Sequence, residues 1–291
     1  MPKITVNGVS LAYEILGKGP PVVFTDGGVD VPKETMRWLA GRMSLGYKAL
    51  VYDRRNSGTS DVLFEDAPSE FELFANDLHT LLESLEMTPA YLWGGSGGLL
   101  VSLLTAYHHP ESVKGLLLEA VPLDNLEFWQ NVAHGYYIES AKVAESKGME
   151  AVVEFSNDWV NWAERIKQNP AGRGQFLSLD PIEFAAIMRK WAAWCTSGRA
   201  HLAGLTDEEL GRITAPAITI PGIDESHPQH TSEELHRLLP NSELLSREEF
   251  FSAAEIDRLL ELQVDWIDGR YMTVYAPFYD SFMKRVEKEQ S

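Results

Sequence analysis

Hydrophobic and polar positions along the first 122 residues follow two alternating periods. Short runs of aliphatic, β-branched and aromatic residues predict buried strands, and apolar residues three and four positions apart predict helices between them. The predicted strands are 4–6, 11–15, 21–25, 49–52, 90–93 and 113–118, and the predicted helices are 71–85 and 99–107. The dipeptide Asn7-Gly8, between the first two strands, is typical of a β-hairpin turn.

The rest of the chain divides into three further blocks. Residues 123–205 show helical periodicity without a convincing strand, and residues 206–269 return to alternation. In this third block the predicted strands are 217–220 and 243–245, and the predicted helices are 231–239 and 255–267. Residues 270–291 form a charged tail or a peripheral helix. The outer blocks, 1–122 and 206–269, predict an α/β core with a mostly parallel sheet covered by helices on both faces. The block 123–205 predicts a helical cap above the carboxyl ends of the strands, where ligands bind in such sheets.

Composition and charge narrow the classes of function. The 291 residues contain 25 Lys and Arg against 43 Asp and Glu, a formal net charge of −18. An acidic surface repels phosphate backbones and anionic lipids, so we expect neither nucleic acid nor membrane as a partner. The amino terminus lacks a signal peptide and no run is long enough to span a bilayer, which predicts a cytoplasmic protein. The single cysteine, Cys195, excludes an internal disulfide and a cysteine-rich metal site.

Candidate chemistry is concentrated between a predicted strand and a predicted helix. The segment Trp93 to Gly98 contains the pattern G-x-S-x-G, with Gly94, Ser96 and Gly98 in register. A tight turn between strand and helix would hold Ser96 in strained backbone angles and project its hydroxyl above the sheet edge. The amino terminus of the following helix favours developing negative charge. The segment therefore predicts a nucleophilic serine.

With this motif the chain resembles the α/β-hydrolase superfamily. Residues 53–60 resemble its strand-end motif of Asp, Arg, Gly and Ser, and residues 216–228 resemble its penultimate strand and acid loop. The resemblance implies an oxyanion hole formed by the backbone N–H groups of Gly97 and Gly28. Asp26 stands where the superfamily usually has a histidine, and we expect its carboxylate to point away from the oxyanion.

The resemblance also implies an acid after the penultimate strand. Asp224 and Glu225 are both candidates there; the residue type and the shorter turn favour Asp224, whereas spacing from Gly222 favours Glu225. Glu119, at the end of the strand that follows the serine, is an alternative because some members of the superfamily take their acid from that position.

The base is where this sequence departs from the superfamily. Its histidine is expected after the last strand, at about 247–253, but that stretch contains none. His227, three residues beyond Asp224, is the best substitute. His134 in the cap and His230 are the alternatives. The other histidines read as residues of the surface or of helix packing.

Aromatic residues are unusually frequent in the predicted cap, where ordinary packing explains many of them. The candidates for lining a substrate pocket are Trp129, Tyr136, Trp159, Trp162 and Trp191. Such a pocket favours a bulky, largely apolar small molecule. The sequence thus predicts an α/β hydrolase that cleaves a carboxylic ester or lactone through an acyl-enzyme, and it shows no metal-ligand spacing and requires no cofactor. The alternatives are a lyase or another cofactor-free enzyme on this fold, or a ligand-binding pseudoenzyme.

Overall fold

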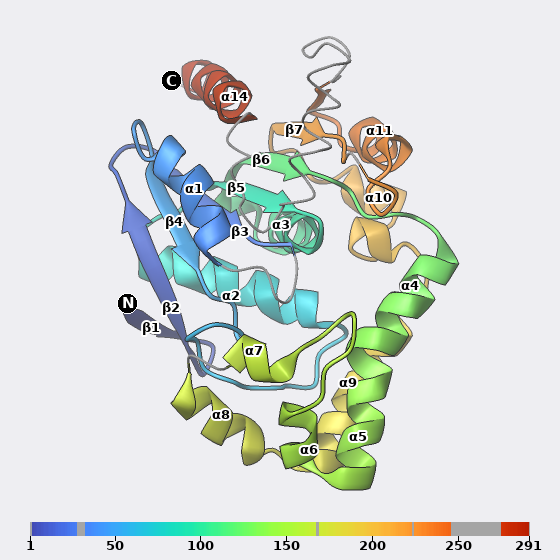
Figure 1. Ribbon diagram of the computed structural model, residues 1–291. Helices are drawn as coiled ribbons and strands as arrows, with labels where there is room; N and C mark the ends of the chain where they lie inside the picture. Colours follow the sequence, from blue (N-terminus) through green and yellow to red (C-terminus); the bar gives the residue numbers. More distant parts are fainter. Residues whose placement is uncertain (1, 28–32, 167–168, 223, 246–274, 291) are drawn as a thin grey trace.

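The computed structural model describes residues 2–27, 33–166, 169–222, 224–245 and 275–290, and its strands form one sheet (Figure 1). The strands are β1 (Lys3–Val6), β2 (Val9–Leu16), β3 (Pro21–Thr25), β4 (Lys48–Tyr52), β5 (Ala90–Gly95), β6 (Val113–Glu119), β7 (Ala217–Ile220) and β8 (Ser242–Leu244). They lie in the order β1-β2-β4-β3-β5-β6-β7-β8. The pairs β1–β2 and β2–β4 are antiparallel and the other pairs are parallel. The predicted α/β fold with a mostly parallel sheet is confirmed.

The first two strands form the predicted hairpin. Asn7 and Gly8 have φ angles of 46° and 80°, the left-handed values that a two-residue type I′ turn requires. Val6 pairs with Val9 across this turn. Strands β3, β5, β6 and β7 are neighbours in the sheet and run parallel to one another, so their carboxyl ends lie at one edge of the sheet.

Helices cover both faces of the sheet, as the alternating pattern predicts. On one face α2 (Glu70–Ser84) and α3 (Gly97–His108) pack together, and on the other α1 (Lys33–Met43) contacts α14 (Ala276–Glu289). The face of α14 that points to the sheet carries Tyr279, Phe282, Met283 and Val286, spaced as one helical stripe and all buried. The end of the chain, expected as a charged tail or a peripheral helix, therefore includes a helix of the hydrophobic core.

The middle of the chain forms the predicted helical insertion. Its helical elements are α4 (Leu126–Val132), the π-helix η2 (Ala133–Ile138), α5 (Glu139–Lys147), α6 (Met149–Val153), α7 (Trp162–Ile166), α8 (Pro170–Leu177) and α9 (Pro181–Cys195). In Figure 1, α5, α6 and α9 lie together at the lower right, far from α14. Its bounds as a separate cap, 123–205, stay a prediction.

Four short elements remain in the described ranges, one before β6 and three between the insertion and β8. They are the 3-10 helices η1 (Pro110–Ser112) and η3 (Ala200–Leu202), and the α-helices α10 (Asp207–Leu210) and α11 (Gln229–Leu238). The predicted helix 255–267 and the stretch 247–253 lie outside the described residues. Across the part of the chain that is described, no helix combines the length and the hydropathy needed to cross a bilayer.

Candidate active site

Ser96 lies at a sharp turn between the central strand β5 and helix α3. Its φ of 52° and ψ of −119° are a strained conformation for a residue with a side chain. The turn is tight because a side chain at Gly94 would collide with the backbone of Gly98, and one at Gly98 would collide with the backbone of Thr25. The Ser96 amide donates to the carbonyl oxygen of Glu119 over 3.1 Å, which ties the turn to strand β6.

The hydroxyl of Ser96 belongs to a hydrogen-bonded chain of three side chains. Its Oγ lies 2.9 Å from Nε2 of His227, a residue 131 positions away in the sequence. His227 Nδ1 lies 2.9 Å from Oδ1 and 3.1 Å from Oδ2 of Asp224. A carboxylate can only accept, so the proton is assigned to Nδ1, and Nε2 then accepts from the serine hydroxyl. This is the nucleophile, base and acid order of a serine triad.

The loop after β7 holds Asp224 and His227 in place through local turns. The Ser226 amide donates to Asp224 Oδ1 over 2.8 Å, and the His227 amide donates to the carbonyl oxygen of Asp224 over 3.1 Å. The Leu123 amide, after β6, donates to the Ser226 carbonyl over 2.8 Å. At Gly222, a side chain would collide with the backbone of His227. Hydrogen bonds within their own loop therefore hold Asp224 and His227 next to each other.

The electrostatic surroundings of Asp224 favour its ionised form. Partial burial opposes ionisation, but the hydrogen bond and charge of His227, together with backbone N–H donors, outweigh it. The pKa of Asp224 is consequently lower than usual. At neutral pH the Asp224 carboxylate is therefore charged.

A pocket of about 240 Å³ opens at Ser96 and His227. Its wall includes Gly97 beside the serine and a set of mostly aromatic residues: Phe71, Phe128, Trp129, Tyr136, Tyr137 and Trp159. These rings form a continuous surface; for example, the centroid of Trp159 lies 5.5 Å from that of Tyr136 and 6.4 Å from that of Phe128. Three of the predicted aromatic residues, Trp129, Tyr136 and Trp159, thus line the pocket.

The other two predicted tryptophans lie elsewhere. Trp162 and Trp191 are 3% and 1% exposed and pack around Phe64, with ring centroids 5.9 Å and 5.8 Å away. Phe176 and Phe184 complete this aromatic cluster. Both tryptophans therefore lie in the core of the insertion and do not contribute to the described wall of the pocket.

The alternative acids and bases do not join the hydrogen-bonded chain. Glu119 is buried and accepts from the Tyr279 hydroxyl over 2.9 Å, on the face of the sheet covered by α14. His134 is exposed, with Nδ1 3.6 Å from Glu139, and His230 Nε2 lies 3.1 Å from Asp124. These alternatives, with the exposed Glu225, do not contribute to the described wall of the pocket.

Two charged residues that the sequence did not single out line the pocket. Arg54 pairs with Asp26 at 2.5 Å, and its guanidinium lies 4.7 Å from the ring centroid of Phe74. Burial raises the pKa of Asp26 to about 6, although Arg54 opposes the shift. Glu70 accepts from the Tyr137 hydroxyl over 2.5 Å. Arg54 belongs to the sequence motif 53–60, so the sequence contains a pattern from which it could have been found. Glu70 lies in the first turn of α2, and no sequence motif marks it.

Of the two predicted oxyanion donors, Gly97 lies within the described residues and Gly28 does not. Gly97 begins α3, where the first amides of a helix lack partners within it, and it lies directly beside Ser96. Gly28 lies outside the described residues. Gly27 approaches the elbow so closely that a side chain on it would meet the backbone of Gly95, so the first glycine-rich loop reaches the serine.

Comparison with known proteins gives the family. Residues 20–145 match the family model described as the alpha/beta hydrolase fold. A non-heme chloroperoxidase from Kitasatospora aureofaciens is 31% identical over 251 residues, 82% of this chain and 87% of the relative. An uncharacterized hydrolase from Bacillus subtilis is 28% identical over 110 residues, which are 38% of this chain and only 40% of that relative. The chain belongs to the α/β-hydrolase superfamily.

Solved structures agree on the fold. A thermophilic esterase from Thermogutta terrifontis superposes with a TM-score of 0.56 at 22% identity, covering 84% of this chain and 89% of the esterase. The enol-lactonase from Burkholderia xenovorans superposes with the same TM-score at 21% identity, covering 91% of this chain and 99% of the lactonase. At such identities the likeness establishes the fold alone.

Proposed function

We propose that this protein hydrolyses a carboxylic ester or lactone through a covalent acyl-enzyme on Ser96. The observation that carries the proposal is the hydrogen-bonded chain from Ser96 through His227 to Asp224. Ser96 and His227, at one end of this chain, line an aromatic pocket. A serine hydroxyl is a weak nucleophile unless a base accepts its proton, and this chain supplies the base together with an acid that orients it.

The reaction would proceed in two steps, formation of the acyl-enzyme and its hydrolysis. Ser96 Oγ attacks the carbonyl carbon while its proton passes to His227 Nε2, and the negative charge moves to the carbonyl oxygen. The N–H groups of Gly97 and Gly28 would stabilise that oxyanion, each by about 3 kcal/mol. His227 returns the proton to the leaving alkoxide, which from a lactone stays attached as a free hydroxyl. Water then attacks the acyl-enzyme by the same route and restores Ser96.

The pocket supports a bulky and largely apolar substrate. Its wall is dominated by aromatic rings, and Arg54 and Glu70 are charged groups in the same wall. Both charges already have partners, Asp26 for Arg54 and Tyr137 for Glu70. A substrate that leaves these pairs intact would gain most of its binding energy from the aromatic surface.

The arrangement of His227 weakens the alternatives that rested on a missing base. The alternatives, a lyase or a ligand-binding pseudoenzyme, rest on the absence of the usual histidine from 247–253. With His227 Nε2 on the serine hydroxyl, absence of a histidine there does not argue against an activated serine.

The test is intact mass after treatment with a fluorophosphonate, alongside hydrolysis of p-nitrophenyl esters of increasing acyl length. We expect a single adduct on the wild type and none on Ser96→Ala. His227→Ala should lose at least about 10³-fold in labelling rate. His230→Ala is the matched control, since His230 is a neighbouring loop histidine paired with Asp124. A folded wild type that forms no adduct and cleaves no ester would refute the proposal.

A second acceptor for the acyl group is favoured by one relative, the 31% identical protein named a non-heme chloroperoxidase. Hydrogen peroxide could replace water in the second step, lose its proton to His227 and leave as a peracid while Ser96 regains its proton. Adding peroxide to the ester assay and measuring peracid tests this. Peracid that is absent in Ser96→Ala would support it, and none from an active wild type would leave hydrolysis as the sole reaction.

A further inference from the structure

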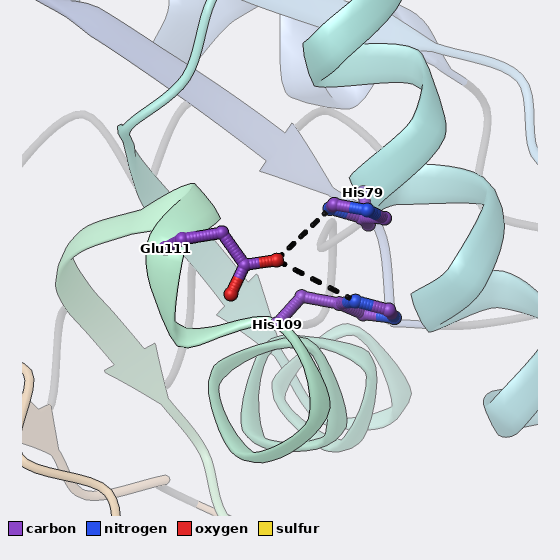
Figure 2. A group of neighbouring side chains, drawn as sticks. All are labelled: His79, His109 and Glu111. Carbon is purple, nitrogen blue, oxygen red and sulfur yellow. Dashed lines mark ion pairs between the residues drawn. The ribbon is translucent and has the colours of Figure 1, made fainter.

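Three side chains able to ligate a metal meet at the end of α3 remote from Ser96 (Figure 2). His79 lies on α2, His109 directly follows α3, and Glu111 lies in the 3-10 turn η1 that leads into β6. One ligand atom from each residue lies within 4.8 Å of the others. Because α3 has 12 residues, about 18 Å of helix separates this cluster from the catalytic turn. Spacing along the chain does not indicate this cluster, since His79 and His109 are 30 positions apart.

Hydrogen bonds orient His109 as a ligand. Its Nε2 lies 2.9 Å from Oδ1 of Asn76, which accepts the Nε2 proton in the arrangement assigned here. The lone pair is then on Nδ1, and Nδ1 faces Glu111 Oε1 at 3.9 Å. A second group that binds the far ring nitrogen fixes tautomer and orientation, as it does for histidines at metal sites.

His79 is oriented in the same way. Its Nε2 lies 3.4 Å from Oε2 of Glu83, and its Nδ1 lies 4.0 Å from Oε1 of Glu111. The buried Ser112 hydroxyl lies 2.7 Å from the same Nδ1, to which it can donate. Nδ1 of each histidine therefore lies about as far from the same Glu111 oxygen, 4.0 Å for His79 and 3.9 Å for His109, and the two dashed lines in Figure 2 mark these contacts.

The two rings stack with centroids 3.9 Å apart and planes 3° from parallel. The stack brings one nitrogen of each ring within 4.8 Å of the other and of a Glu111 carboxylate oxygen. Neutral imidazole is the form that binds metal. Two imidazole nitrogens and one carboxylate oxygen therefore meet at one edge of the stacked rings.

We propose that His79, His109 and Glu111 bind one divalent transition-metal ion of the zinc type, with water in the remaining position. Two imidazoles and one carboxylate suit zinc, copper and nickel, whereas magnesium and calcium prefer all-oxygen sites. Metal–ligand distances of about 2.0–2.2 Å require the ligand atoms to approach to about 3.3 Å. The Glu111 side chain is 64% exposed, so it is free to move inward. The stacked rings must tilt so that their lone pairs converge.

The bound ion would join α2 to the junction between α3 and β6. It would stabilise the folded state because the unfolded chain does not hold these three ligands together. The effect concerns stability of the scaffold behind the serine, and it is independent of the chemistry proposed for Ser96.

The test is calorimetric titration of zinc chloride into the full-length, chelator-treated protein at neutral pH. We expect one site in the wild type, at least about tenfold weaker binding in Glu111→Gln, and loss of the site in His109→Asn. Excess zinc should raise Tm by about 2–4 °C in the wild type and leave Glu111→Gln unchanged. The matched control is His230→Asn, which removes an exposed histidine that is also paired with a carboxylate and should keep the site.

A second variant tests the geometry more closely. Ser112→Ala removes the hydroxyl that competes for His79 Nδ1 and should tighten zinc binding about two- to tenfold. With copper(II) bound, electron paramagnetic resonance should show two nitrogen ligands, and His79→Asn should leave one. Zinc binding that survives Glu111→Gln and His109→Asn unchanged, or that disappears only in His227→Asn, would overturn the proposal. Equal affinity for magnesium would overturn it as well.

Discussion

The carboxyl edge of the sheet holds a carboxylate on each side, and the two have different surroundings. Asp224 follows β7 in a partly exposed loop and bonds to a histidine that reaches Ser96. Glu119 ends β6, is 5% exposed, and accepts from Tyr279, which in turn accepts from the indole N–H of Trp93. One carboxylate bonds to the histidine that contacts the serine hydroxyl. The other bonds to a phenol, whose pKa burial and the charge of Glu119 raise well above its ordinary value.

Strand alternation explains why Glu119 lies on the side away from His227. Along β6, Leu116 and Leu118 pack into the core beneath α2 and α3, and Leu117 packs into the core beneath α14. Glu119 is two positions beyond Leu117 and therefore shares its face. The difference teaches that position at a strand end does not make an acid catalytic; the face of the sheet on which it lies decides which partners it meets.

The largest expected effect comes from exchanging each acid for its amide. Asp224→Asn should lower kcat by about 10³–10⁴-fold, because the amide no longer favours the tautomer that leaves Nε2 free to accept. Glu119→Gln should keep kcat within about threefold and lower stability instead. Ester hydrolysis and urea unfolding of both variants measure this contrast. A Glu119→Gln enzyme with wild-type stability and a 10³-fold loss of kcat would reverse the assignment.

The pH dependence of stability tests a third carboxylate, Asp26, which pairs with the pocket residue Arg54. Burial raises the pKa of Asp26 from its ordinary value of 3.8 to about 6, despite Arg54. The folded state thus binds this proton more tightly than the unfolded chain does. The stabilisation is complete below about pH 4 and is lost as pH rises through about 6, an effect of about 3 kcal/mol.

The Asp26→Asn variant isolates that contribution. Relative to the variant, the wild type should lose stability between pH 4 and pH 7, as measured by urea unfolding at each pH. Parallel curves for the two proteins across this interval would show that Arg54 keeps Asp26 ionised throughout.

Removing the partner of Glu119 should have a smaller effect on the opposite face. Tyr279→Phe deletes a hydroxyl that donates to Glu119 and accepts from Trp93, and it leaves the ring in place. We expect a loss of about 1–3 kcal/mol, because a buried carboxylate keeps one donor fewer. Urea unfolding gives the loss, and kcat should stay unchanged. A drop in kcat without loss of stability would connect this face to the chemistry after all.

Much of the fold could be predicted from periodicity, because buried strands and two-sided helix cover leave a strong pattern. Strand 21–25 matches β3 residue for residue, and helix 71–85 differs from α2 by one residue at each end. Helix α1 was missed although Met36, Leu39, Ala40 and Met43 form a buried stripe. The exposed face also carries a large apolar residue, Trp38, which is 54% exposed and weakens the contrast between the two faces.

The site was predictable where its signal is local in sequence. Ser96 stands in a glycine-rich turn, and Asp224 and His227 are three residues apart in one loop. The cluster of His79, His109 and Glu111 depends on how α2 packs beside α3, which periodicity does not specify. The same limit applies to the aromatic residues of the insertion, since composition shows that they are many but not which way each one points.

Two tryptophans three residues apart make the smallest and most discriminating test. Trp159 lines the pocket, whereas Trp162 is 3% exposed and its indole N–H donates to Ser140 over 2.9 Å. Replacing either by phenylalanine removes similar apolar area, so the location alone should set the outcome. Trp159→Phe should lower kcat/KM for a long-chain ester about three- to fivefold, with Tm nearly unchanged. Trp162→Phe should lower Tm by several degrees and leave kcat/KM unchanged. A loss of kcat/KM in Trp162→Phe equal to that in Trp159→Phe would mean that the insertion responds as one body, and that the pocket and its supporting core are not energetically separate.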